Sequence, residues 1–313
     1  MTCQPLPSRK RSALTRKLYR QRMLLLMLLP CFALVLLFSY GPLWGWYLAF
    51  VRYKPGSAIL GAPWVGLDNF KKFLAQSLDF GKVIRNTLVV NIASLAVSMP
   101  CEITLAVILY ELRFKRYKRV VQTISYLPYF ISWVIVGGVF FQFFSIQGVV
   151  NNLLMATGLI DTPIMFLGLP STAWPMLIFS RLWKNLGWST IVYLGAMGSI
   201  DPSLYEAAYV DGAKRWARIW HITLPGLVPT ISVMLILAAG GLINGAFDQV
   251  YVFQNPANLD YCDTIDTMVY RMGLQNANFS YATAIGMFNN FVSIILMVLV
   301  NGLVKRINGR SLI

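Results

Sequence analysis

Long apolar runs separated by polar segments set the pattern of this 313-residue chain. Six of the runs reach the roughly 20 mainly apolar residues that a transmembrane helix needs. They lie near residues 22–44, 86–110, 120–144, 174–198, 226–248 and 281–303. The alternation of apolar and polar positions that marks the strands of a membrane β-barrel is absent from the sequence. Because backbone groups in lipid must be hydrogen-bonded internally, the pattern predicts an all-α integral membrane protein with six transmembrane helices.

Positive charge is concentrated in alternate polar segments, and this predicts an orientation. The chain has a net charge of +15 and 27 Lys and Arg residues. Most of them lie in residues 9–22, 113–119, 214–218 and 305–310. Since Lys and Arg accumulate on the cytoplasmic side of a membrane, both termini and the loop 199–224 are expected inside the cell. The sequence then divides into a basic cytoplasmic tail, 1–21, and a six-span domain, 22–313. Its first run is too long for a cleaved signal peptide.

Several kinds of chemistry are missing from the sequence. The chain has one histidine and four dispersed cysteines, and it contains no G-x-x-x-x-G-K-[ST] segment that would bind a nucleotide. We therefore expect a chain that is not itself an enzyme and that holds no metal or cofactor of its own. If it moves a solute uphill, an ion gradient or another polypeptide must supply the energy.

The polar loop before the fifth run has more internal detail than a spacer needs. Asp201 and Pro202 are typical of a helix start, and Gly212 is typical of its end. A second amphipathic helix, 213–222, is expected next, with a basic face suited to an anionic membrane surface. Pro225 is expected to separate it from the fifth span. One interpretation is a simple connector whose basic residues only fix the topology.

A second interpretation rests on a motif in this loop, which fits the pattern EAA-x3-G-x9-I-x-LP. The seven specified positions are Glu206, Ala207, Ala208, Gly212, Ile222, Leu224 and Pro225. This is the signature of ABC importer permeases, and the chain resembles that family. The segments "SIDPSLYEAAYVDGAKRWARIWHITLPGLVPT" and "GAPWVGLDNF" are similar to the maltose-type sugar-uptake branch, and within it to the subgroup that serves complex polysaccharide fragments in bacteria.

The resemblance implies a permease subunit in the bacterial inner membrane that imports oligosaccharides. It implies that the loop is a coupling helix that docks on an ATP-hydrolysing subunit, where ATP and magnesium would be bound. It further implies a second, related permease, two ATPase subunits and an extracytoplasmic sugar-binding protein. An ion-coupled secondary transporter is the main alternative, but it leaves the motif unexplained. A membrane-embedded enzyme would need a cluster of catalytic acids or a metal site, whereas the few acidic residues here are scattered, and a structural scaffold would leave the Glu206 loop unexplained.

Charged residues within the runs indicate where a solute passes, because ionisable groups in a membrane are costly and are usually paired or functional. Glu102 and Lys184 lie near the middle of their runs, and Arg181 is one helical turn from Lys184. Either Glu102 and Lys184 neutralise each other, or Arg181 and Lys184 face the path and bind an anionic group such as a uronate. Other candidates for contact with sugar are Trp183 or Trp188, Asn244, Asp248, Asn289 and Asn290. The asparagines are equally consistent with hydrogen bonds between helices.

Overall fold

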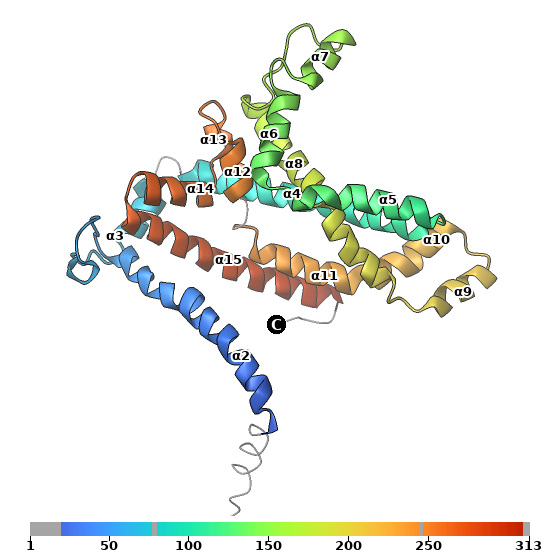
Figure 1. Ribbon diagram of the computed structural model, residues 1–313, viewed down its shortest axis with the longest axis horizontal. Coiled ribbons are helices and arrows are strands. Elements are labelled where there is room, and N and C mark those ends of the chain that lie inside the picture. Colours follow the sequence, from blue (N-terminus) through green and yellow to red (C-terminus); the bar gives the residue numbers. More distant parts are fainter. Residues whose placement is uncertain (1–19, 77–79, 244–246, 309–313) are drawn as a thin grey trace, which may run out of the picture.

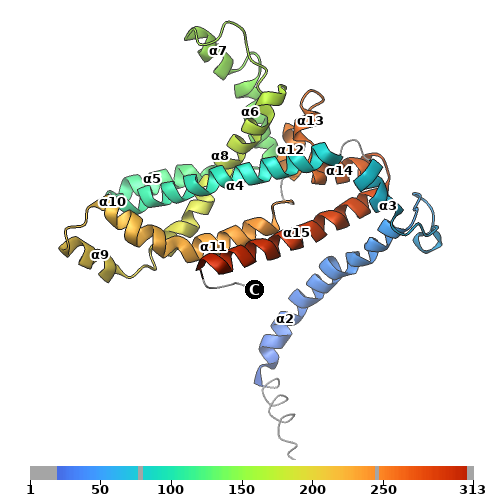
Figure 2. The same ribbon diagram turned by 180° about the vertical axis from the view of Figure 1, so that it is seen from behind.

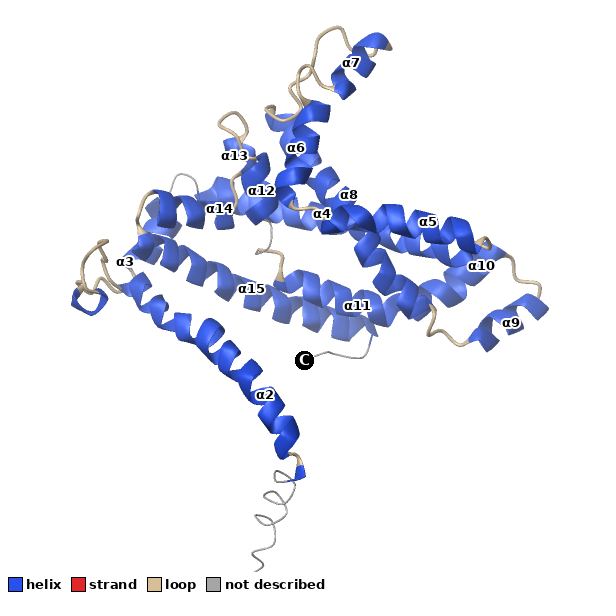
Figure 3. Ribbon diagram, viewed as in Figure 1, coloured by secondary structure: helices blue, strands red, loops and turns tan. Residues whose placement is uncertain are grey.

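The computed structural model describes residues 20–76, 80–243 and 247–308. Within these residues nearly all regular structure is helical, and strand pairing is limited to a single bridge between Val51 and Trp64 (Figure 3). The α-helices are α2 (Arg22–Val35), α3 (Asp68–Lys71), α4 (Phe80–Glu111), α5 (Lys115–Tyr126), α6 (Trp133–Phe144), α7 (Val149–Ala156), α8 (Pro170–Met197), α9 (Pro202–Val210), α10 (Arg215–Arg218), α11 (Leu224–Gly240), α12 (Phe247–Phe253), α13 (Leu259–Cys262), α14 (Ile265–Tyr270) and α15 (Phe279–Asn308). The predicted all-α class is confirmed.

Five helical segments in the described part of the chain are long and apolar enough to cross a membrane. They are Arg22–Phe50, Phe80–Glu111, Trp133–Ala156, Arg215–Gly240 and Phe279–Arg306. The predicted run 174–198 forms α8, whose 28 residues span about 42 Å at ~1.5 Å per residue. Helix α8 is therefore long enough to cross a bilayer, but its composition is less apolar than that of the five segments above. Six crossings therefore remain a prediction.

Two of the predicted spans are interrupted. The run 120–144 is not one helix, because α5 ends at Tyr126 and α6 begins only at Trp133. Pro128 lies in the break, where it lacks the backbone N–H that a continuing helix requires. The run 226–248 is also divided, since α11 ends at Gly240 and α12 begins at Phe247. Glycines 240 and 241 favour this ending.

The long helices α4, α5, α11 and α15 form the body of the molecule, and α8 crosses it (Figures 1 and 2). Helix α2 diverges from this body in both views and contains no buried residue. At the far end of the body α9 protrudes beyond the other helices. A close approach joins α8 to the end of α5, because a Cβ atom at Gly187 would collide with the backbone of Ser125 and Tyr126.

The apolar core of the described residues forms three clusters, two of which border the segments discussed below. One joins α4, α6, α8 and α12 through buried side chains that include Val90, Phe140, Leu177 and Phe253. Another joins α4, α8 and α11 through Ala106, Tyr193, Met197 and Leu227. Helices α4 and α8 are therefore held together on both sides of the polar residues that they carry at mid-length.

The loop before α11 begins as predicted. Asp201 caps α9 by accepting a hydrogen bond from the backbone N–H of Ser203 at 2.9 Å, and this contact lowers the pKa of the Asp201 carboxyl group. Gly212 has φ +76°, in the left-handed region that a glycine adopts without strain. The helix α9 therefore ends where the sequence indicates.

The predicted separation at Pro225 is wrong. One helical segment runs from Arg215 to Gly240 and passes through this proline. A π-helical turn, η6 (Ile219–Thr223), lies directly before α11, and its last bond joins the N–H of Leu224 to the carbonyl of Ile219. The wide turn accommodates the proline ring, which would otherwise clash with the preceding turn.

Candidate functional site

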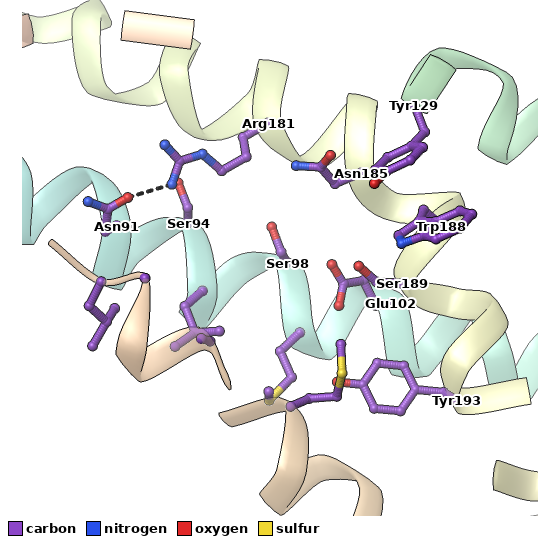
Figure 4. Close-up of a pocket in the computed structure, with 16 residues that line it drawn as sticks. Asn91, Ser94, Ser98, Glu102, Tyr129, Arg181, Asn185, Trp188, Ser189 and Tyr193 are labelled. Atoms are coloured by element: carbon purple, nitrogen blue, oxygen red, sulfur yellow. Dashed lines mark hydrogen bonds between the residues drawn. The ribbon is translucent and has the colours of Figure 1, made fainter. Parts of the chain in front are cut away.

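A cavity of about 280 Å³, with polar side chains in a partly apolar lining, lies between α4, α8 and α11, and three of the predicted residues, Glu102, Arg181 and Trp188, line it (Figure 4). Glu102 enters from α4 and Arg181 from α8. Its other polar and aromatic lining residues are Asn91, Ser94 and Ser98 from α4, Asn185, Trp188, Ser189 and Tyr193 from α8, and Tyr129 from the break between α5 and α6. Met234, Ala238 and Leu242 are among the residues that add an apolar wall from α11 and its end.

Unpaired buried polar groups gather in the lining of this cavity. Five of its buried side-chain polar atoms lack a hydrogen-bond partner: Asn91 Nδ2, Ser94 Oγ, Ser98 Oγ, Arg181 Nη2 and Tyr193 Oη. An unpaired buried polar group costs about 1–3 kcal/mol. Such a concentration in one cavity is typical of a site that water or a polar ligand fills.

Arg181 is held in place by neutral groups. Its Nε donates to Gln249 Oε1 at 2.8 Å and its Nη1 donates to Asn91 Oδ1 at 2.7 Å. Both acceptors are amide oxygens, and no salt bridge in the described residues involves Arg181. The guanidinium is thus positioned on two sides while its charge stays uncompensated. A buried charge without a counter-ion is costly, so this end of the cavity favours an anion.

Glu102 and Lys184 do not form the pair that one interpretation of the sequence required. The Glu102 carboxyl group lies beside the Ser189 side chain (Figure 4), and no salt bridge among the described residues joins it to a basic side chain. The Lys184 ammonium instead donates to the carbonyl oxygens of Tyr129 at 2.7 Å and Ile131 at 2.5 Å. A third bond, at 3.3 Å, goes to the carbonyl of Pro128.

Lys184 therefore stabilises the break between α5 and α6, whose carbonyl groups have lost their helical partners. Its ammonium also lies 5.5 Å from the ring centroids of Tyr129 and Trp133, within range of a cation–π interaction. Lys184 lines a different cavity, of about 400 Å³, together with Asp248. Arg181 and Lys184, which one of the two interpretations of the sequence placed together at an anion, are thus in separate environments.

The remaining predicted contact residues are dispersed. Trp188 lines the Arg181 cavity and stacks on Tyr129 with ring centroids 4.6 Å apart and planes at 5°. Trp183 instead contacts Phe140 of α6. Asn289 and Asn290 line a third cavity, of about 560 Å³, beside Asp266. Asn244 lies outside the described residues.

The loop motif forms a second candidate site. Glu206 and Ala207 are exposed on the protruding helix α9, and Ala208 is half-buried (Figure 1). Helix α9 is attached to the turn η6, because the Tyr205 hydroxyl forms a 3.0 Å hydrogen bond with the hydroxyl of buried Thr223. An ion pair of 3.8 Å between Arg215 and Glu111 ties the following segment to the end of α4. These contacts link α9 to the turn η6 and link α10, the helix that follows α9, to α4.

Comparison with known proteins gives the family to which this chain belongs. Residues 102–311 match the family described as binding-protein-dependent transport system inner membrane component. The chain is 40% identical over 296 residues to Protein LplB of Bacillus subtilis, covering 94% of this chain and 92% of that protein. It is 41% identical over 305 residues to the polygalacturonan/rhamnogalacturonan transport system permease protein YteP of the same organism, covering 95% of this chain and 92% of YteP.

Solved structures agree with the sequence relatives. The chain superimposes with a TM-score of 0.86 and 40% identity on a chain of a bacterial ABC transporter involved in the import of the acidic polysaccharide alginate. The match covers 95% of this chain and 99% of that one. A structure of bacterial alginate ABC transporter in complex with an alginate pentasaccharide-bound periplasmic protein matches with the same TM-score at 39% identity. The chain therefore belongs to the binding-protein-dependent transport system inner membrane components, as a multi-pass permease subunit of an ABC importer.

Proposed function

We propose that this permease imports oligosaccharides that carry carboxylate groups, such as uronates. The observation that carries the proposal is the uncompensated Arg181, held by Asn91 and Gln249 in a cavity rich in unpaired donors and acceptors. The relatives support it, since YteP is a polygalacturonan/rhamnogalacturonan permease and the structural match is an importer of an acidic polysaccharide. A carboxylate of the substrate would be the counter-ion that Arg181 lacks.

The proposal extends to the assembly. The chain forms the path as a heterodimer with a second permease, and two ATPase subunits bind the cytoplasmic side, where both termini and α9 lie. Those subunits hold ATP and magnesium and perform the hydrolysis, so this chain needs no catalytic residues. An extracytoplasmic protein delivers the sugar. Glu206 on α9 offers a carboxylate to a basic group of the ATPase, Ala207 permits close approach, and Gly212 provides the bend. Because the chain belongs to the ABC permease family, ATP hydrolysis by a partner subunit takes the place of the ion gradient that a secondary transporter would use.

Gentle extraction of the tagged chain from its native membrane tests this assembly. We expect an ATPase and a second six-span permease to copurify, in a ratio of two ATPase chains to one of each permease. Mass spectrometry of the intact complex measures the ratio. Recovery of the intact chain alone, or with a second copy of itself in place of a different permease, would contradict the proposed composition.

A further inference from the structure

The two charged groups of the cavity lie at different positions along it. Arg181 binds Asn91, whereas Glu102 lies beside Ser189 (Figure 4). The Cα atoms of Arg181 and Ser189, both on α8, are separated by roughly 12 Å along its axis, at ~1.5 Å per residue, and the Arg181 guanidinium points toward Asn91, away from Ser189 (Figure 4). This distance exceeds the length of one pyranose ring. The two charges therefore meet different units of any sugar chain that fills the cavity.

The surroundings of Arg181 suit a carboxylate. Besides the guanidinium, the nearby Asn91 amide nitrogen and Ser94 hydroxyl are buried and without partners. All three belong to groups that donate hydrogen bonds. A uronate carboxylate placed there would receive charge-assisted bonds from Arg181 and satisfy these donors at the same time.

The surroundings of Glu102 suit a neutral sugar. Its carboxyl group is 7% exposed at the residue level and accepts hydrogen bonds, which the hydroxyl groups of a sugar can donate. The Trp188 ring, stacked on Tyr129, adds a flat apolar surface at this end, and Tyr193 adds an unpaired hydroxyl. A substrate carboxylate here would instead meet the carboxyl group of Glu102. Two carboxylates that share a site cannot both ionise without a large cost.

Because one end of the cavity carries the Arg181 cation and the other end carries the Glu102 carboxyl group, we infer that Glu102 is a specificity-determining residue. It selects sugar chains that contain both acidic and neutral units. The inference rests on the proposed function, in which Arg181 binds a uronate. A bound segment then places a carboxylate at Arg181 and a neutral unit at Glu102. Oligosaccharides in which acidic and neutral sugars alternate fit this cavity, and oligosaccharides that carry a carboxylate on every unit are disfavoured.

The test compares the reconstituted complex containing the wild-type chain with one containing Glu102→Gln, which keeps the size of the side chain and one acceptor oxygen but removes its charge. ATP hydrolysis at pH 8, with the same sugar-binding protein, is titrated with an alternating uronate–neutral oligosaccharide, a uronate-only oligosaccharide and a neutral one. The ratio of half-stimulating concentrations, uronate-only to alternating, is the readout. Because the binding protein is common to both complexes, its own preference cancels when the two ratios are compared.

We expect Glu102→Gln to lower this ratio about tenfold or more. The substitution removes the repulsion between the Glu102 carboxylate and a substrate carboxylate, which weakens binding of the uronate-only oligosaccharide to the wild-type complex. Glu102→Asp, which keeps the charge, should keep the wild-type ratio, as should Asp161→Asn, which removes an exposed carboxylate outside the cavity. Glu102→Ala provides a second neutral variant if the glutamine variant does not assemble. A ratio unchanged within twofold in the neutral variants would overturn the inference. So would loss of all stimulation in an assembled neutral variant.

The proposed function fails in a different way. If the wild-type complex responds to the neutral oligosaccharide but to neither acidic one, then no uronate binds Arg181. If it responds to both acidic oligosaccharides and Glu102→Gln leaves their ratio unchanged, the uronate importer stands and only the role of Glu102 is wrong.

Discussion

Replacing Glu206 by lysine is expected to abolish ATP-driven transport by separating the permease from its ATPase. Glu206 is exposed on α9, the helix that protrudes from the body of the protein, so the substitution disturbs no packing within the chain. At the interface it removes a charge-assisted hydrogen bond and brings a like charge to the basic partner group. Truncating a buried charge pair alone costs about 2–5 kcal/mol, or roughly 30-fold to several thousand-fold in affinity. Copurification of the ATPase with the tagged permease measures the loss.

A matched control lies five residues further along the same loop. Asp211→Lys makes the same change of charge at an exposed position outside the motif, immediately after α9. We expect the ATPase to stay bound to this variant. Equal recovery of the ATPase with Glu206→Lys and with the wild-type chain would show that α9 is not the docking element, whereas equal loss in both variants would indicate a general charge effect.

Reversing the charge of Arg181 is expected to stop uptake of uronate oligosaccharides while the complex still assembles. Each hydrogen bond to a charged group is worth about 1.5–3 kcal/mol, and placing like charges together costs several kcal/mol more. Arg181→Glu should therefore reduce uptake into ATP-loaded proteoliposomes by at least about 100-fold. The Asn91 amide nitrogen has no partner in the wild-type chain and can donate to the new carboxylate, which favours folding.

Lys71→Glu is the control for this second variant, because it reverses an exposed charge outside the cavity. Uptake in this control should match the wild type, and size-exclusion profiles should show intact complexes for both variants. Uptake of uronates by Arg181→Glu at the wild-type rate would remove Arg181 from the path.

The elements that carry the loop motif were predictable from local sequence. Asp201 and Pro202 mark the start of α9 and Gly212 marks its end, because capping and left-handed backbone depend on residues a few positions apart. The role of Pro225 was not predictable in the same way. Whether a proline ends a helix depends on the turn before it, and here a π-helical turn lets the helix continue.

The cavity was predictable only in part. Asn91, Ser94, Ser98 and Glu102 recur at three- and four-residue spacing within an apolar run, and this spacing places them on one face of a helix. Within this run the sequence-based prediction rested on charge alone, so of these four residues it named only Glu102. The partner of Lys184 was not predictable, since it consists of backbone carbonyls exposed by a break in another run. Gln249 reaches Arg181 from α12, which exists only because the predicted span 226–248 is divided.

The central claim is that this permease imports acidic oligosaccharides, and the most direct measurement is ATP hydrolysis by the reconstituted wild-type complex with its binding protein. Uronate-containing and neutral oligosaccharides of equal length are compared at the same concentration. The account predicts stimulation by uronate-containing chains and none by neutral ones. Stimulation by neutral chains alone would contradict it and would leave Arg181 as a structural residue of the α4–α8 contact.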